Sequence, residues 1–266
     1  MTNLDAARLR QLLDGFPGRR VAILGDLMLD RYVWGEVNRI SQEAPVPIVE
    51  VKRNSVRFGA AANVAENVAT LRADASLVGV VGDDEPGREL LALLSERGVD
   101  VSRVVTVPGR PTTTKMRVIA HSQQVVRADS EVTDDIAGGA EGRVLDGLKA
   151  ALAECDVLIV SDYGKGVVTA STLGAAIAAA GEHDVKVCVD PKESHFQSYV
   201  GVAAITPNQK EASAAVGLRI TDDESLMEVG WKLQKSLGAE CVVITRGEHG
   251  MSLFMSDGTV THLPTV

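Results

Sequence analysis

The chain has 266 residues, of which 45% are hydrophobic, enough apolar material for one large α/β domain with its own core. Its formal net charge is −9, which excludes a global electrostatic attraction to nucleic acid or to an anionic membrane. An anionic ligand must therefore be met by local basic residues and backbone amides.

The first sixteen residues, MTNLDAARLRQLLDGF, have the pattern of an amphipathic helix and lack the apolar core of a signal peptide. No later stretch is long enough to span a bilayer, so we expect a cytoplasmic protein. The cysteines lie in apolar, strand-like runs without metal-binding spacing, which favours buried, reduced thiols at Cys155, Cys188 and Cys241.

Within residues 21–30, VAILGDLMLD, an apolar run closed by Gly25 has the pattern of a buried parallel strand, and two carboxylates, Asp26 and Asp30, lie just beyond its carboxyl end. Ligands of open α/β sheets bind outside the carboxyl ends of the strands, so these carboxylates are placed to hold hydroxyl groups. The alternative is that they cap the following turn or helix.

Residues 32–58 and 111–129 alternate between apolar and polar side chains, which predicts two pairs of antiparallel strands. We expect these two insertions to form one small sheet that covers the strand ends. Between them, FGAAANVAENVATL predicts a glycine turn and a helix, followed by the strand ASLVGVV and the helix PGRELLALLSERG.

From Ile136 onward, helix and strand patterns alternate regularly, which predicts a parallel sheet flanked by helices. The expected helices are residues 136–153, 169–180, 208–217 and 225–238; the expected strands are 156–160, 185–190, 202–206, 240–245, 251–255 and 260–263.

Polar residues follow four more of these strands. They are Ser161 to Lys165, Asp190 to Lys192, Thr206 to Asn208, and Thr245 to Gly247. Each group alone is explained by a turn or a helix cap, but together with Asp26 they predict a shared cleft at one sheet edge.

These residue types suit phosphoryl transfer, which depends on positioning and on charge neutralisation. Asn208 and Glu211 are three residues apart at a helix start, where they either hold Mg²⁺ or form a capping box. Gly247 and Gly250 let backbone amides approach a phosphate, although a tight turn explains them as well. The sequence contains neither GxxxxGK[ST] nor GxGxxG, so P-loop and dinucleotide-binding readings lose support.

Residues 59–67, GAAANVAEN, place small side chains at a helix start, where the backbone can come close to a ligand and Asn63 can bind a hydroxyl. The alternative is an alanine-rich helix packed on the sheet.

The order of GDLMLD, GAAAN, SDYGKG, VDPK, TPNQKE and TRGEHG resembles the ribokinase-like (PfkB) carbohydrate kinases. NRISQEAPVPIVEV, SDYGKG and TPNQKEA together are similar to the D-glycero-D-manno-heptose 7-phosphate kinases of lipopolysaccharide core synthesis, from about Arg20 to the last residue. The resemblance implies a three-layer α/β/α sandwich with a small antiparallel β lid. It also implies a homodimer through that lid, and transfer of phosphate from Mg²⁺-bound ATP to the anomeric hydroxyl, giving the 1,7-bisphosphate.

The resemblance assigns roles to residues of this chain. It implies sugar binding by Asp26, Asp30, Gly59 and Asn63, and binding of the substrate phosphate by Lys165, Arg117 and Arg39. It implies nucleotide and Mg²⁺ binding by Asn208, Gln209, Lys210 and Glu211, and an ATP side lined by Asp190, Lys192, Thr245, Gly247 and Gly250.

The sequence departs from the family pattern at two points. Ala60 stands where the family has the second of two glycines, which would reshape the sugar pocket. The family's catalytic aspartate belongs to a Gly-Ala-Gly-Asp segment whose place lies beyond Val266. We therefore expect either that the chain continues past Val266 or that it binds its ligands without catalysis. A PfkB kinase for another sugar is a further alternative.

Overall fold

The centre of the molecule is a nine-stranded, mostly parallel sheet, seen in a computed structural model that describes residues 5–265. Only β12 and β13 run antiparallel to their neighbours. In spatial order the strands are β13 (Val260–Leu263), β12 (Met251–Met255), β11 (Cys241–Thr245), β10 (Ala204–Ile205), β9 (Lys186–Asp190), β8 (Val157–Ser161), β1 (Arg20–Gly25), β4 (Asp74–Gly82) and β5 (Val104–Val107).

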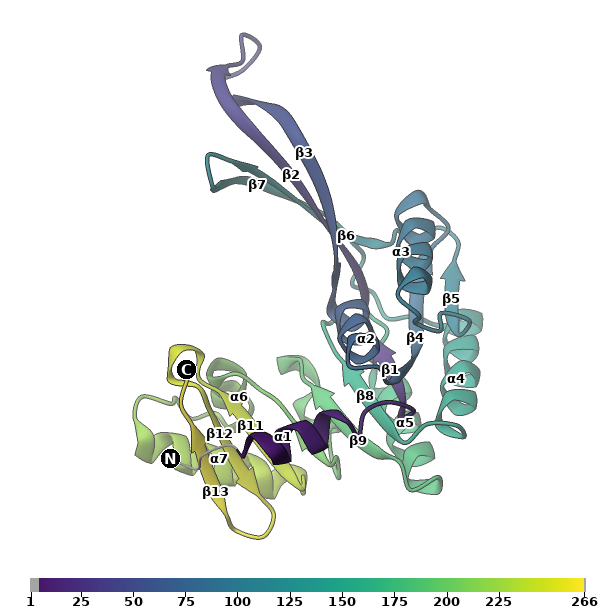
Figure 1. Ribbon diagram of the computed structural model, residues 1–266, viewed down its shortest axis with the longest axis vertical. Helices are drawn as coiled ribbons and strands as arrows, with labels where there is room; N and C mark the ends of the chain where they lie inside the picture. Colours follow the sequence, from purple (N-terminus) through teal and green to yellow (C-terminus); the bar gives the residue numbers. More distant parts are fainter. Residues whose placement is uncertain (1–4, 266) are drawn as a thin grey trace.

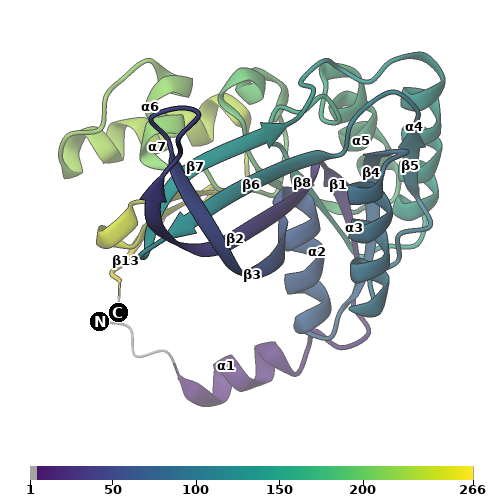
Figure 2. The same cartoon turned by 90° about the horizontal axis from the view of Figure 1, so that it is seen from above.

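Helices cover both faces of this sheet, which gives the predicted three layers (Figure 2). One face carries α2 (Ala60–Thr70) and α3 (Glu85–Glu96), and the other carries α4 (Gly138–Leu152), α5 (Ala170–Glu182), α6 (Gln209–Val216) and α7 (Asp223–Leu237). Two short 3-10 helices, η1 (Glu193–Ser198) and η2 (Gly247–His249), follow β9 and β11. The fold class inferred from the sequence is confirmed.

The first strand ends at Gly25, as predicted, but the residues after Asp26 form a strand of a second sheet. β1 ends at Gly25, where an added Cβ would lie 2.2 Å from the carbonyl oxygen of Ser161 on β8. After Asp26 the chain enters β2 (Leu27–Ile40), which leaves the main sheet. Gly25 therefore allows the close strand contact just before the chain changes sheet.

β2 belongs to a second sheet of four strands, which we call the lid. It also contains β3 (Pro47–Gly59), β6 (Thr113–Ala120) and β7 (Gln123–Ser130), in the order β3-β2-β6-β7. It extends from the main sheet as an arm (Figure 1). Each hairpin is antiparallel, as predicted, but β2 and β6 pair in parallel, which alternation within a strand cannot reveal.

The three cysteines are unpaired but only half-buried. Cys188 on β9 and Cys241 on β11 both pair with Ala204 of β10, so all three residues lie in one row across the sheet. They lie on the sheet face opposite the buried residues that pack under α5 to α7. Incomplete cover on that face explains why the thiols of Cys188 and Cys241 are less buried than the sequence predicts.

The predicted N-terminal helix is present as α1 (Ala6–Leu13), with every residue exposed; residues 1–4 of that prediction lie outside the described part. Strand β5 was not predicted. Within residues 5–265 we find no helix that combines the length and the apolar character needed to cross a bilayer.

Candidate active site

The carboxyl ends of β8, β9, β10 and β11 meet around one pocket. These strands are parallel neighbours, so their carboxyl ends reach the same edge of the sheet. The cavity there, which we call the strand-end pocket, has a volume of about 340 Å³. It is lined by Asp162, Tyr163, Asp190, Pro191, Lys192, Thr206, Asn208, Glu211 and Thr245. The structure thus brings together polar residues from all four strand ends.

Asn208 and Glu211 form the capping box that the sequence left open as an alternative. Asn208 Oδ1 accepts the N–H of Glu211 at 3.0 Å, and Glu211 Oε2 accepts the N–H of Asn208 at 2.8 Å. Both residues also line the strand-end pocket. Because carboxamide and carboxylate oxygens keep further lone pairs, capping α6 leaves them able to bind a ligand.

Two carboxylates, those of Asp190 and Glu211, line the strand-end pocket and affect each other. Burial raises the pKa of Asp190, and the negative charge of Glu211 raises it further. Burial also raises the pKa of Tyr163, with a further contribution from the Asp190 carboxylate. A cation placed beside Asp190 and Glu211 would stabilise both carboxylates.

A buried anchor that the sequence analysis did not identify holds the start of the 162–167 loop. The Asp162 side chain is fully buried; its Oδ2 accepts the Tyr199 hydroxyl at 2.6 Å and lies 2.5 Å from His195 Nδ1. Its Oδ1 accepts the N–H of Gly164 at 2.9 Å. Burial, followed by the charge of Asp162, raises the pKa of Tyr199, which stays a hydrogen-bond donor. The anchor fixes the loop that borders the pocket.

Asp26 organises the same loop from the end of β1. Its side chain is 1% exposed and accepts the N–H groups of Tyr163, Lys165 and Val167 at 2.8, 3.1 and 3.1 Å. Burial raises the pKa of Asp26, and the three amide hydrogen bonds oppose that rise. This geometry supports a positioning role for Asp26, and its direct contact with sugar stays a prediction.

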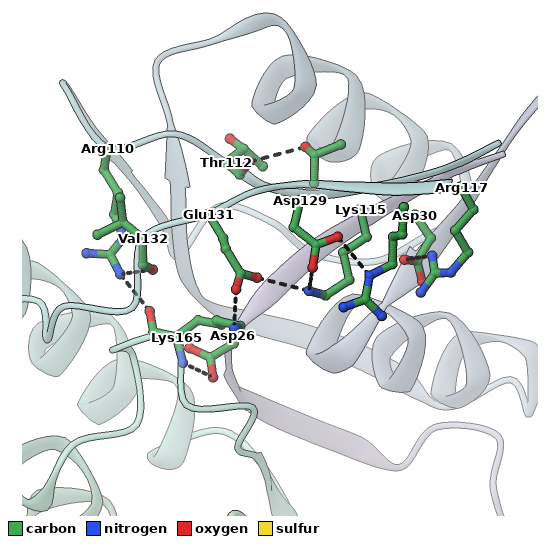
Figure 3. Close-up of polar contacts among 12 residues, drawn as sticks. Asp26, Asp30, Arg110, Thr112, Lys115, Arg117, Asp129, Glu131, Val132 and Lys165 are labelled. Atoms are coloured by element: carbon green, nitrogen blue, oxygen red, sulfur yellow. Dashed lines mark hydrogen bonds and ion pairs between the residues drawn. The ribbon is translucent and has the colours of Figure 1, made fainter. Parts of the chain in front are cut away.

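Arg110 closes the loop from the other side. One of its terminal nitrogens donates to the carbonyl oxygens of Val132, Asp134 and Lys165 at 3.2, 2.9 and 2.6 Å (Figure 3). Gly166 has φ +83°, and an added Cβ would lie 2.1 Å from the Asp134 carbonyl oxygen. The Asp134 carbonyl oxygen thus accepts a hydrogen bond from Arg110 and leaves no room for a side chain at Gly166.

An alternating chain of charges connects the loop to the lid. Glu131 accepts hydrogen bonds from Lys165 Nζ at 2.7 Å and from Lys115 Nζ at 3.0 Å. Lys115 Nζ also donates to Asp129 at 2.9 Å, and Asp129 accepts from Arg127 Nε at 2.9 Å. Figure 3 shows Glu131 between the two lysines. This chain ties β6 and β7 to the strand-end region.

Asp30 lies within lid strand β2 and not at the end of the first strand. Its Oδ1 accepts from Arg117 at 2.5 Å, and an added Cβ at Gly59 would lie 3.1 Å from its Oδ2. Ala60, which follows Gly59, has φ +50°, a conformation that costs a non-glycine residue about 1–2 kcal/mol. The departure from the paired glycines thus coincides with backbone strain beside Asp30.

Several residues singled out from the sequence lie elsewhere. Arg39 is exposed near the far end of β2, about 30 Å along the strand from Asp30 at 3.3 Å per residue, so the structure does not bring it to its own chain's site. Asn63 is exposed and lines a separate cavity of about 480 Å³ between α2, α3 and the base of β3. Its contact with sugar stays a prediction.

Four predicted nucleotide-side residues do not line the strand-end pocket: Gln209, Lys210, Gly247 and Gly250. The Lys210 side chain is 87% exposed and lies 3.7 Å from Glu193. An added Cβ at Gly250 would lie 1.9 Å from the Leu263 carbonyl oxygen, so the tight-turn explanation accounts for this glycine. Gly247 is exposed with φ +57°.

The lid residues Lys115, Arg127, Asp129 and Glu131 were missed, although a signal for them exists. Alternation in TTTKMRV and QVVRADSE places these charged side chains on one face, with the apolar ones on the other. The signal does not say which face is turned toward the site. In the described part of the chain, no three His, Cys, Asp or Glu side chains are grouped as a metal would require.

The fold and the strand-end pocket define a ribokinase-like α/β protein. Phosphofructokinase-2 from Escherichia coli, solved in complex with fructose-6-phosphate, superposes with a TM-score of 0.76 over 94% of this chain and 80% of its own, at 19% identity. An Arabidopsis thaliana ribokinase complexed with ribose and ATP gives a TM-score of 0.70 over 94% and 78%, at 18% identity. These similarities establish the fold alone.

Sequence comparison narrows the class. The model of the pfkB family carbohydrate kinases matches residues 19–266, and the chain belongs to this family. The bifunctional protein HldE of Geobacter sulfurreducens is 47% identical over 91% of this chain and 50% of its own length. The D-beta-D-heptose 7-phosphate kinase of Bordetella bronchiseptica is 45% identical over 90% of this chain and 74% of its own. The chain thus spans about half the length of the bifunctional relatives.

Proposed function

We propose that the protein containing this chain uses ATP to phosphorylate the anomeric hydroxyl of D-glycero-D-manno-heptose 7-phosphate, as a cytoplasmic step of lipopolysaccharide core synthesis. The observation that carries this proposal is the strand-end pocket with a lid of cationic side chains beside it. The names and identities of the relatives support the choice of a heptose phosphate as substrate.

The strand-end pocket is the proposed nucleotide side of the cleft. Lys192 supplies a cation for the phosphates, and Asn208 and Glu211 supply oxygens for Mg²⁺, directly or through water. The raised pKa of Asp190 next to Glu211 supports this fit, because neither carboxylate forms an ion pair with another residue in the range 5–265. When bound, Mg²⁺ would neutralise charge on the transferred phosphate.

The lid side is the proposed sugar side. In the reaction, the sugar hydroxyl oxygen forms a bond to the γ-phosphorus of ATP, the bond from that phosphorus to the bridging oxygen breaks, and ADP leaves. The hydroxyl proton must go to a base, which the family resemblance places in a segment after Val266. The residues described here position the substrates, through the 162–167 loop that Asp26 and Asp162 hold.

We also propose that two copies form a homodimer through the lids. The lid face opposite the cations carries Val33, Met116, Val118 and Val126, and the side chains of Met116 and Val126 are 38% and 51% exposed. An exposed apolar sheet face of this kind favours association. Val126→Glu should convert the dimer to a monomer in light scattering; an unchanged mass would reject this interface.

The test of function is a coupled ADP-release assay on the protein containing this chain, with heptose 7-phosphate, fructose 6-phosphate and ribose as acceptors. We expect turnover with heptose 7-phosphate and a raised KM for ATP in Lys192→Met. Lys186→Met serves as the control, because Lys186 lies at the start of β9, the strand that Lys192 follows, and is exposed and paired with Glu240. Binding of both ligands without turnover would favour a non-catalytic module, and preference for another acceptor would favour a different PfkB kinase.

A further inference from the structure

One face of the lid carries more positive charge than its own carboxylates balance. In the described structure the cations are Arg53, Arg57, Lys115, Arg117 and Arg127, joined by Lys165 from the loop after β8; the carboxylates are Asp30, Asp129 and Glu131. The whole chain has a formal charge of −9. A local surplus of cations on an acidic protein marks a place where an anion is stabilised.

Strand register puts the arginines of this face close together. Tyr32 on β2 is directly opposite Arg117 on β6, and Arg117 is directly opposite Arg127 on β7. Directly opposite residues have Cβ atoms about 4.5–5.5 Å apart, and like charges in such a pair destabilise the sheet. Folding alone therefore does not favour the Arg117 and Arg127 pair.

A third arginine, Arg57, shares the Tyr32 ring with Arg117. Arg117 lies 5.3 Å and Arg57 lies 5.5 Å from the centroid of the Tyr32 ring. Arg57 comes from β3, where its opposite residue is Asp30. Two arginines from two strands thus contact one aromatic side chain, and Arg127 on a third strand is directly opposite one of them.

Two carboxylates hold these arginines only in part. Asp30 accepts from one nitrogen of Arg117, and Asp129 accepts from Nε of Arg127, whose side chain is 49% exposed. Arg57 forms no ion pair with any residue in the described range. Because each guanidinium has five N–H donors, most donors of this cluster stay available.

We propose that Arg57 and Arg127 act with Arg117 to bind the phosphate group of the sugar phosphate, the one that the reaction does not transfer. A guanidinium group binds two phosphate oxygens at once through two parallel N–H donors, and the cations of this face outnumber its carboxylates, so a phosphate monoester would be stabilised there. This inference rests on the proposed function. In a heptose 7-phosphate the phosphate is at the opposite end of the sugar from the anomeric hydroxyl. The lid therefore holds the phosphate while the reacting hydroxyl faces the strand ends.

Kinetics of Arg57→Met and Arg127→Met test the site. Each change removes charge-assisted hydrogen bonds and keeps most of the aliphatic stem, so we expect KM for heptose 7-phosphate to rise roughly tenfold to hundredfold. The kcat and the KM for ATP should change less than threefold. Arg57→Lys and Arg127→Lys should recover part of the loss, since lysine keeps the charge without the paired donors. Arg53→Met, on the same face of β3 but beside Trp34, is the matched control.

A second measurement separates this inference from the proposed function. Calorimetry with inorganic phosphate should show binding to the wild type and to Arg53→Met, and binding weakened at least tenfold in Arg57→Met and Arg127→Met. Phosphate binding with this pattern, in a protein that does not turn over heptose 7-phosphate, would reject the proposed function and keep the anion site. Equal phosphate binding and equal KM values in all variants that melt like the wild type would overturn the site.

Discussion

The substitution Asp26→Asn tests whether this residue positions the 162–167 loop. The carboxylate accepts N–H groups from Tyr163, Lys165 and Val167 and is 1% exposed. Asparagine keeps one acceptor oxygen and places an NH₂ donor where the second oxygen was. At least one of the three amides then faces a donor and is left without a partner in a buried place.

The size of the effect follows from two opposed contributions. A lost hydrogen bond to a charged group costs about 1.5–3 kcal/mol, and an unpaired buried N–H adds about 1–3 kcal/mol. Removing a buried negative charge offsets part of this, since burial raises the pKa of Asp26. We expect a net loss of about 2–3 kcal/mol, which corresponds to a melting temperature roughly 4–12 °C lower.

Urea and thermal unfolding measure this loss. The control is Asp83→Asn, because the Asp83 side chain is 66% exposed and its partner Arg88 is 67% exposed, so its free energy of unfolding should change by less than about 0.5 kcal/mol. If Asp26→Asn melted like the wild type but no longer bound sugar, the positioning argument would be refuted and direct sugar contact supported.

Three further predictions concern the loop, the lid and α6. The pKa of Glu131 lies below its ordinary 4.5, because hydrogen bonds from its two lysines outweigh burial. In urea titrations the wild type should therefore be more stable than Glu131→Gln above pH 4.5, and this difference in the free energy of unfolding should shrink as the pH falls below 4.5. Gly166→Ala should cost more than about 3 kcal/mol through overlap with the Asp134 carbonyl, whereas Gly164→Ala meets no backbone and should cost about 1–2 kcal/mol. Glu211→Gln keeps the capping acceptor, so stability should hold within about 0.5 kcal/mol while affinity for Mg²⁺-ATP falls.

Each of these predictions has a contrary result. A wild-type advantage over Glu131→Gln that stays constant from pH 7 to pH 3 would show that the Glu131 charge does not hold the lid. Equal losses in the two glycine variants would show that the loop moves away from the overlap. Unchanged Mg²⁺-ATP affinity in Glu211→Gln would leave Glu211 as a cap only.

The layers of the fold were predictable because the parallel strands are continuous apolar runs separated by helical patterns. The end of the first strand at Gly25 was predicted too, and the close contact of Gly25 with Ser161 accounts for it. The strand after Asp26 was not predicted, since the apolar residues of VAILGDLML continue from one sheet into the next. Asp30 was therefore predicted at a strand end, and it lies in the lid.

The site was predictable where a strand end fixes the position of a residue. Asn208 and Glu211 are examples, because β10 delivers them to the sheet edge beside Thr245. His195 and Tyr199 were not predictable, since they reach Asp162 from 33 and 37 residues away through the short 3-10 helix η1. The distance of Arg39 from the site was not predictable, because the sequence does not show that β2 continues as one strand from Leu27 to Ile40.

Alternate residues of the lid strands point to opposite faces of the sheet, so the proposed phosphate site and the proposed dimer contact lie on different faces of the lid. Asp30, Tyr32, Arg117 and Arg127 occupy the face with the proposed phosphate site, and Val33, Met116 and Val126 occupy the proposed dimer face. A slip of one residue would exchange the faces, so the register must be fixed. Arg31, which pairs with Glu85 and Glu89 of α3, anchors β2 to the main domain. Association of two lids and binding of substrate would therefore act on opposite sides of the same strands, so loss of this anchor should weaken both.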